Sequence, residues 1–278
     1  MPFTLSHPAA VLPLITRGRG RGPLVAAALV AGSTAPDVPY FADSVVPGAF
    51  GLGAVTHAWW GVPTVDVAVA AVLVGLWHLL LREPLAALLP ARWVPQVPAV
   101  APRAGGSALR RAGWFAVSAA LGAASHVGWD GFTHPGRFGV RLFPVLDRTA
   151  VAGRPLHAVL QYGTSAVALA VLAWWLLRES RRRSAPVAAS GPLPGPVPAL
   201  GPRARWAVYG WIVLAAAAGT ALRIARWSGG PGPEPAYELV PTVAFGSLAG
   251  AGLALLGYGA LRRLTAGKAL ARCFGRAA

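Results

Sequence analysis

Long apolar runs constrain the fold of this chain more than any other feature of its sequence. A helix needs about 20 mostly apolar residues to cross the hydrocarbon layer of a membrane. Five runs approach or reach that length, and a sixth, Leu24 to Ala35, is shorter. Only 12% of the 278 residues are charged, against about 25% in soluble domains. The sequence therefore predicts an all-α, polytopic membrane helical bundle of about six transmembrane helices. The five longer runs are Val65 to Leu81, Ala112 to Trp129, Leu156 to Leu177, Trp206 to Leu222 and Val240 to Leu261.

The distribution of cations orients these runs. Lys and Arg accumulate on the cytoplasmic side of bacterial membranes. If all six runs cross with the N-terminus inside, the cytoplasmic segments hold three, five, six and five cations, 19 of the 25, and the outer loops hold 6. We therefore expect a multi-pass protein of the bacterial cell (inner) membrane with cytoplasmic N- and C-termini. Because the cations lie between apolar runs, the net charge of +16 indicates contact with the lipid bilayer and no nucleic-acid binding.

A secretory signal is an alternative for the first run. Arg17 to Arg21 precede the apolar residues Leu24 to Val30 and the small residues Ala31 to Ala35, which is the order of a cleavable signal peptide. The basic region is unusually long for a signal, and cleavage would remove His7. We therefore favour a membrane segment.

Composition divides the chain into four regions. Residues 1–180 hold all six histidines and form an N-terminal helical membrane region. Residues 181–205 are rich in Pro and Arg and are predicted to be a flexible cytoplasmic linker. A C-terminal helical pair follows at 206–262, where glycines such as Gly246 and Gly250 suit close packing, and a basic cytoplasmic tail at 263–278. The single Cys273 excludes an intrachain disulfide and a cysteine-based metal cluster.

The sharpest motif spans Ser125 to Pro135, at the predicted outer end of the third crossing. His126 and Asp130 are four residues apart, so a helix places both side chains on one face, close enough to bind one cation. His134 lies four residues further on, but Pro135 disfavours helical geometry in the residue before it. His134 therefore either binds a metal or orients a ligand. The alternative is that His126 and Asp130 form a hydrogen-bonded pair between helices.

Three further polar residues in apolar surroundings could converge on this pair. His7 follows Ser6 at a helix-start signal, Asp37 closes the first apolar run, and His57 precedes the second. Each has an ordinary alternative: an interfacial histidine, a loop-capping aspartate and a neighbour of an aromatic belt. Asp37 and His57 share the predicted outer face with the motif. Sets of His and Asp favour zinc or another borderline divalent metal.

His7 is the exception to this co-location. Strict topology places it on the cytoplasmic side, unless the first run is a half-helix or part of a re-entrant hairpin, which protein can cover at depth. Weaker candidates are Asp66 and His78, which we read as interfacial. A polar stripe begins the fourth crossing and either supports the metal ligands or joins helices. The stripe consists of His157, Gln161, Thr164 and Ser165.

Several segments together resemble an uncharacterised family of bacterial membrane proteins, domain of unknown function 4184, over essentially residues 1 to 260. More distantly, the order of these motifs is similar to membrane-bound metal-dependent hydrolases of the inner-membrane type and to zinc-dependent phospholipase C-like proteins. That resemblance implies a hydrolytic metal site, although this chain has one histidine, His57, where those proteins tend to show two. The segments are Met1 to Ala10, Ala35 to Asp37 with Tyr40 and Phe41, Thr56 and His57, Ser125 to His134, and Leu160 and Gln161 with Ser165.

The leading hypothesis is a metal-dependent hydrolase acting on an ester or phosphoester, from a lipid or another membrane-presented substrate. Its predicted divalent metal is zinc, and its predicted catalytic residues are Asp130 and His134, which would handle protons. The rival is a non-catalytic membrane scaffold or transporter with a buried polar network. The sequence shows no nucleophile elbow, phosphate loop or His-Glu-x-x-His motif, which excludes those enzyme classes. The predicted metal ligands are His7, Asp37, His57, His126 and Asp130.

Overall fold

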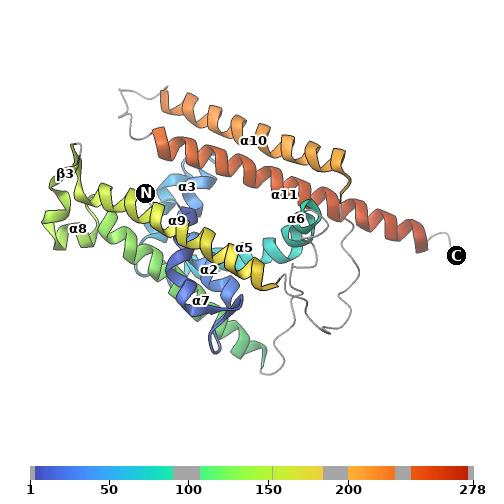
Figure 1. Ribbon diagram of the computed structural model, residues 1–278, viewed down its shortest axis with the longest axis horizontal. Coiled ribbons are helices and arrows are strands. Elements are labelled where there is room, and N and C mark those ends of the chain that lie inside the picture. The colour runs from blue at the N-terminus through green and yellow to red at the C-terminus, as the bar shows by residue number, and fades with distance from the viewer. Residues whose placement is uncertain (1–3, 90–106, 152, 184–199, 229–238, 275–278) are drawn as a thin grey trace. The chain divides into compact units, whose positions relative to one another are not determined.

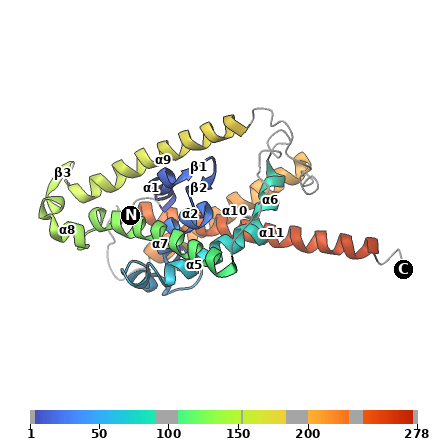
Figure 2. The same ribbon diagram turned by 90° about the horizontal axis from the view of Figure 1, so that it is seen from below.

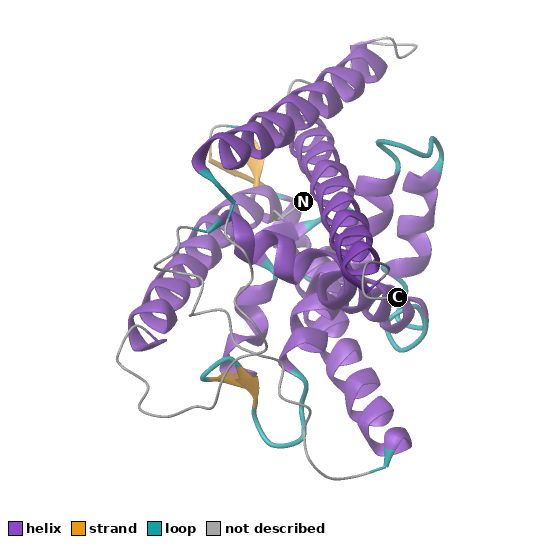
Figure 3. Ribbon diagram, turned by 90° about the vertical axis from the view of Figure 1, so that its right-hand side faces the viewer, coloured by secondary structure: helices purple, strands orange, loops and turns teal. Residues whose placement is uncertain are grey.

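The computed structural model describes residues 4–89, 107–151, 153–183, 200–228 and 239–274. Helices dominate these residues, and the strands form two small antiparallel ribbons, as Figure 3 shows. The predicted all-α class is therefore confirmed. The chain divides into two compact units, which can be followed by residue number in Figure 1. The N-terminal unit comprises Met1–Pro39, Gly48–Val74 and Pro102–Ala188, and the C-terminal unit comprises Tyr40–Pro47, Gly75–Ala101 and Ala189–Ala278.

The N-terminal unit begins with a hairpin, here called the N-terminal hairpin, Thr4 to Asp37. Arg17 and Gly18 have φ angles of 52° and 71°, and two positive φ angles in succession are what a two-residue hairpin turn requires. Figure 2 shows the resulting ribbon beside α1 and α2. Because the chain returns along itself, His7 and Asp37 lie at the same end of the hairpin. Its elements are the 3-10 turn Thr4–Ser6, α1 Pro8–Val11, the 3-10 turn Leu12–Leu14, β1 Ile15–Thr16, β2 Arg19–Gly20, α2 Ala26–Thr34 and the 3-10 turn Ala35–Asp37.

The hairpin packs on α7 (Ala108–Thr133) through two glycines. A Cβ atom on Gly32 of α2 would lie 2.1 Å from the carbonyl oxygen of Ala119, and one on Gly122 of α7 would lie 2.2 Å from that of Leu29. No real Cβ sits that close to another atom. The two helix backbones therefore touch directly, and neither position accepts a side chain without moving the helices apart.

Ser118 of α7 fixes the start of α2. Its hydroxyl accepts a hydrogen bond from the backbone N–H of Val25 at 2.9 Å and donates one to the carbonyl of Trp114 at 2.6 Å. A first-turn N–H has no partner within its own helix, so α7 supplies the missing acceptor. Small apolar residues complete the contact, which is why the helices approach so closely. Its buried members include Ala28, Ala31, Ala35, Ala70 and Ala119.

The remaining elements of the N-terminal unit are α5, α9 and the shorter elements that precede α5 or lie between α7 and α9. α9 packs against α1, the first 3-10 turn and α7. α8 lies beside the end of α7, and the second ribbon precedes α9. The elements are the 3-10 turn Ala49–Leu52, α4 Gly53–Thr56, α5 Val65–Leu76 (whose last residues belong to the C-terminal unit), α8 Phe138–Leu142, the 3-10 turn Pro144–Asp147, β3 Thr149–Val151, β4 Arg154–Pro155 and α9 Leu156–Arg183. The short helix α3, Val38–Ala42, spans the boundary between the two units.

The C-terminal unit is built on the pair α10 (Pro202–Ser228) and α11 (Leu239–Phe274). A Cβ on Gly250 would lie 2.0 Å from the carbonyl oxygen of Ala215, and one on Gly246 would lie 2.6 Å from that of Gly219. This close backbone contact is the arrangement that small residues permit between helices in lipid. Before this pair, α5 continues through the π-helical turn Trp77–Leu81 into α6, Arg82–Leu88. Tyr258 anchors α6 to α11 by donating to the carbonyl of Pro84 at 3.0 Å.

Among the described residues, four helices are long and apolar enough to cross a membrane, which suggests a membrane protein. The predicted count of six is therefore not confirmed. The run Leu24 to Ala35 forms the nine-residue α2, about 14 Å long and too short to span. α7 has 26 residues, but serines and the site histidine reduce its apolar character. The four helices are Val65–Leu88, Leu156–Arg182, Pro202–Ser228 and Leu239–Thr265.

The division into four regions stays a prediction. Residues 184–199 of the predicted linker 181–205, and residues 275–278 of the predicted tail 263–278, lie outside the described residues.

Candidate metal centre

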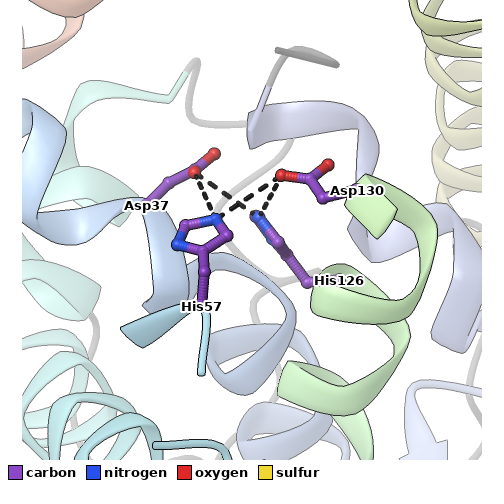
Figure 4. A group of neighbouring side chains, drawn as sticks. All are labelled: Asp37, His57, His126 and Asp130. Atoms are coloured by element: carbon purple, nitrogen blue, oxygen red, sulfur yellow. Dashed lines mark ion pairs between the residues drawn. The ribbon is translucent and has the colours of Figure 1, made fainter. Parts of the chain in front are cut away.

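Three segments of the N-terminal unit bring four side chains to one point, as Figure 4 shows. Asp37 ends the N-terminal hairpin, and His57 follows α4 directly. His126 and Asp130 project from one face of α7, one turn apart. The hydroxyl of Thr56 donates to the carbonyl of Pro36 at 2.7 Å, which holds the segments of Asp37 and His57 side by side.

The four facing atoms alternate between imidazole nitrogen and carboxylate oxygen. Nε2 of His57 lies 3.6 Å from Oδ1 of Asp37 and 3.5 Å from Oδ2 of Asp130. Nε2 of His126 lies 3.4 Å from each of the same two oxygens. All four atoms lie within 4.8 Å of one another. Zinc bonds of about 2.1 Å in a tetrahedron give ligand separations of about 3.4 Å, so the group could hold a metal ion.

These separations are too long for direct hydrogen bonds, whose donor to acceptor distances are about 2.7 to 3.2 Å. An interhelical network of hydrogen bonds, the alternative for His126 and Asp130, would bring at least one pair within that range. The observed spacing instead leaves each nitrogen nearly equally distant from two oxygens. Four donor atoms at such separations could surround one shared cation.

Backbone carbonyls orient both imidazoles. Nδ1 of His126 lies 2.8 Å from the carbonyl oxygen of Ser33, and Nδ1 of His57 lies 3.0 Å from that of Gly53. A carbonyl can only accept, so Nδ1 carries a proton in each ring, and when the ring is neutral Nε2 presents its lone pair to the centre. Metal-binding histidines commonly have this second hydrogen bond. Thr4 similarly donates to Oδ2 of Asp37, leaving Oδ1 toward the centre.

The centre is closed to solvent. None of the four residues exposes more than 6% of its surface. Nε2 of His126 and Oδ1 of Asp37 have no hydrogen-bond partner among the described residues. Unpartnered buried groups of this kind are costly, and two adjacent buried carboxylates also repel each other. A bound cation would relieve both costs.

The pKa values show how strongly these groups depend on opposite charge. Burial alone raises the pKa of Asp37, but His126 and His57 outweigh it and hold that pKa well below its usual range. Burial alone lowers the pKa of His57, but contacts with the carboxylates of Asp130 and Asp37 outweigh it and raise that pKa above its usual value. A divalent cation would satisfy the same carboxylates with both imidazoles neutral.

His7 and His134 lie against the other oxygen of Asp130. Nε2 of His7 is 3.5 Å from Oδ1 of Asp130, and its ring stacks on His126 at 3.6 Å between centroids. Nδ1 of His134 is 3.6 Å from the same Oδ1. Burial, with the neighbouring His126, lowers the pKa of His7 to about 3, and burial lowers that of His134 to about 4. Both rings are therefore neutral near pH 7, and neither belongs to the four-residue group.

The position of His7 follows from the N-terminal hairpin. A six-crossing topology places His7 and Asp130 on opposite faces of the membrane. The structure brings them within 3.5 Å because α2 returns toward the start of the chain instead of crossing. All five residues predicted as metal ligands therefore gather at one place, four around a common point and His7 beside it.

The weaker sequence candidates do not belong to the four-residue group. His157 pairs with Asp147 at 3.3 Å, and the hydroxyl of Thr164 accepts from the indole of Trp129 at 3.3 Å, so part of the stripe joins α9 to its neighbours. Asp66 is fully buried and both its oxygens lack a hydrogen-bond partner among the described residues. His78 belongs to the C-terminal unit.

Sequence reasoning missed the groups that hold the ligands in place. The carbonyls of Ser33 and Gly53 are backbone atoms, and no side-chain pattern marks them. Thr4 could have been found, because a hydroxyl three residues before His7 faces the same end of the hairpin as Asp37. Gly32 and Gly122 carry a weak signal, as small residues inside apolar runs.

The described residues form a mainly helical protein with four apolar helices that could cross a membrane and a buried His/Asp group that could hold a metal ion. The family model described as Domain of unknown function (DUF4184) matches residues 1–259. The chain belongs to this family. No curated protein and no solved structure matches the chain.

Proposed function

We propose that this chain is an integral membrane protein that binds one divalent metal ion, zinc, through Asp37, His57, His126 and Asp130, and uses it in hydrolysis. The observation that supports this most is the spacing of the four buried donor atoms, 3.4 to 3.6 Å between each nitrogen and the two oxygens. The orientation of both imidazoles by backbone carbonyls adds to it.

Zinc is proposed from the chemistry of the donors. Two neutral imidazoles and two carboxylates form a borderline set that suits zinc, whereas magnesium and calcium prefer oxygen ligands alone. The two carboxylates balance the charge of a divalent cation. The absence of cysteine from the centre disfavours the copper(I) and iron–sulfur alternatives.

The proposed reaction is hydrolysis of an ester or phosphoester. A zinc ion there would lower the pKa of bound water and polarise the scissile group. Water would add across the ester bond, its oxygen joining carbon or phosphorus while the alcohol leaves with a proton. Asp130 would take up the proton of the bound water through Oδ1, with Nδ1 of neutral His134 lying 3.6 Å from that oxygen, which keeps the proposed catalytic pair Asp130 and His134.

The membrane arrangement that fits these observations is multi-pass in the bacterial cell (inner) membrane, with the centre toward the outer face. The N-terminal hairpin would place Arg17 to Arg21 at its tip, on the cytoplasmic side, and His7 toward the outer face beside Asp130. α7 would cross the membrane beside the hairpin, which covers its polar residues. In this arrangement the C-terminus is cytoplasmic, as predicted from the sequence. The N-terminus lies on the outer side, unlike the cytoplasmic position predicted from the cation count.

A structural metal in a non-catalytic membrane scaffold is the second candidate. The closure of the centre favours it, because four protein ligands fill a tetrahedral site and catalytic zinc keeps one position open. A transporter would need the centre to open alternately to the two membrane faces, and the sequence lacks the paired halves typical of that class.

Metal content after purification tests the proposal. We expect about one zinc per chain, lost in His126→Ala and kept in His157→Ala, a matched histidine outside the group. Wild-type protein without stoichiometric zinc, manganese or iron, or with metal unaffected by His126→Ala, would contradict it. Hydrolysis of ester and phosphoester lipids by zinc-loaded protein then separates the enzyme from the scaffold.

A further inference from the structure

Aromatic residues form an exposed surface at the end of the site helix. The ring of Trp59 lies 5.5 Å from that of Phe138, between centroids, and Phe132 lies 5.3 Å from Phe138 and 6.2 Å from Phe143. These contacts join the loop after His57 to α8. We call this the α8 surface: Trp59, Trp60, Phe138, Leu142 and Phe143, each exposing between 40 and 66% of its area.

Arginines precede, lie in and follow α8 along the chain. Residues 137–154 contain Arg137, Arg141, Arg148 and Arg154, four of the six cations that fall in the predicted outer loops. Arg141, Arg148 and Arg154 are exposed. The single acidic residue of this segment is Asp147, which faces His157 at 3.3 Å. The segment therefore presents a net positive charge next to exposed aromatic and aliphatic side chains.

The α8 surface adjoins the candidate metal centre. The ring of Phe138 covers Gly131, where an added Cβ would lie 2.1 Å from Cε1 of that ring. Gly131 immediately follows Asp130, so α8 rests on the turn of α7 that carries the ligand. Figure 1 shows α8 at the end of α7, and α8 precedes α9 in the sequence. Whatever docks on this surface is held beside the centre.

We propose that the α8 surface, with Arg141, Arg148 and Arg154, binds the headgroup layer of anionic phospholipids and presents such a lipid to the metal centre. Exposed aromatic and aliphatic residues bordered by arginines are typical of segments that lie in the membrane interface. Arginine matches phosphate in charge and in the geometry of its donors. A cation count this high in one outer loop runs against the positive-inside rule, and an anionic ligand explains it.

The part of this inference that concerns turnover rests on the proposed hydrolase function. It narrows the substrate from an ester or phosphoester to an anionic phospholipid. Water would add across one of its ester bonds, and the alcohol and acid parts would separate. The lipid-binding part stands on the α8 surface alone and does not depend on the metal.

A fluorophore at exposed Val145 tests the lipid preference locally. In a Cys273→Ser, Val145→Cys background, the labelled protein is placed in phosphatidylcholine nanodiscs with a small fraction of headgroup-spin-labelled phosphatidylglycerol or phosphatidylcholine. Quenching by the anionic lipid should exceed that by the neutral one. Because one arginine near an anionic surface enriches lipid about fivefold, replacing all three arginines by Gln should reduce the preference by at least about fivefold. Replacing them by Lys is the charge-matched control and should retain it.

The outcomes separate the two proposals. Equal quenching in wild-type protein, or an unchanged preference in the Gln variant, overturns the lipid-binding inference whether or not zinc is bound. Lipid mass spectrometry of nanodiscs holding zinc-loaded wild-type protein tests turnover, and equal turnover of neutral lipid overturns the narrowed substrate. A preference for phosphatidylglycerol in protein that binds no metal overturns the proposed function and leaves the α8 surface as a lipid-binding site.

Discussion

Replacing Gly122 by Ala should damage the metal centre although Gly122 is not a ligand. The new Cβ would lie 2.2 Å from the carbonyl oxygen of Leu29, and Cβ contacts under 3.0 Å are essentially never seen. The N-terminal hairpin must therefore move from α7 by about 0.8 Å. The hydrogen bond from His126 to the Ser33 carbonyl, 2.8 Å long, would stretch to about 3.6 Å, beyond the usual range. Asp37 moves with the same hairpin.

The expected effect is a loss of zinc affinity by about 10- to 100-fold, the usual cost of removing a group that orients a metal ligand. Overpacking should also lower the free energy of unfolding by about 1 to 3 kcal/mol. Competition with a fluorescent chelator measures the affinity in purified, detergent-solubilised protein. Size-exclusion chromatography shows whether the variant remains folded.

Gly113→Ala is the matched control, because it lies on the same helix and no atom lies within 4 Å of its Cβ position. It should bind zinc as tightly as the wild type. If folded Gly122→Ala protein binds zinc with unchanged affinity, direct backbone contact between α2 and α7 does not set the ligand geometry, and the reasoning fails. Equal losses in both variants would also refute it.

Three further predictions concern the hydrogen bond of Ser118, the packing of Gly250 and the pKa of His57. Ser118→Ala leaves the part-buried N–H of Val25 without its acceptor and should lower stability by about 1 kcal/mol, as measured by thermal unfolding in detergent; an unchanged midpoint would show that water replaces the hydroxyl. Gly250→Val should force α10 from α11, since even a Cβ would lie 2.0 Å from Ala215, and should lower the unfolding temperature while leaving zinc content unchanged. The pKa of His57 is raised, so protons should displace zinc as the pH falls through that raised value, starting above the usual histidine range near 6.5. Affinity independent of pH between 5 and 8 would exclude His57 as a ligand.

The long helices could be predicted from the sequence because each is marked by its own apolar run. The apolar run Leu156 to Leu177 corresponds to α9, Leu156–Arg183. The helix is longer than the run because it continues through arginines, and a hydropathy pattern stops at the first of them. Such side chains can reach water from the end of a membrane helix. A crossing by the run Leu24 to Ala35 was not confirmed. Its residues are apolar, but they form the nine-residue α2, which packs on α7.

The cation count could not distinguish a hairpin from a crossing. Arg17 lies in the turn of the N-terminal hairpin and Arg19 follows that turn, and a hairpin tip near one membrane face carries the same charge signature as the end of a spanning helix. The pair His126 and Asp130 was predictable from helical spacing alone. The convergence of Asp37 and His57 on it was inferred from a shared face, and their role as ligands stays a prediction until metal is measured.

The return of the chain at Arg17 has a consequence for the order of assembly. Ser33 of the N-terminal hairpin meets His126 across 93 residues of sequence, so the hairpin leaves the ribosome long before α7 exists to cover it. Its histidine and aspartate cannot enter lipid unpaired. In the proposed membrane arrangement, the hairpin would therefore wait at the membrane surface during synthesis, and its packing on α7 and the formation of the proposed centre would occur as one late step.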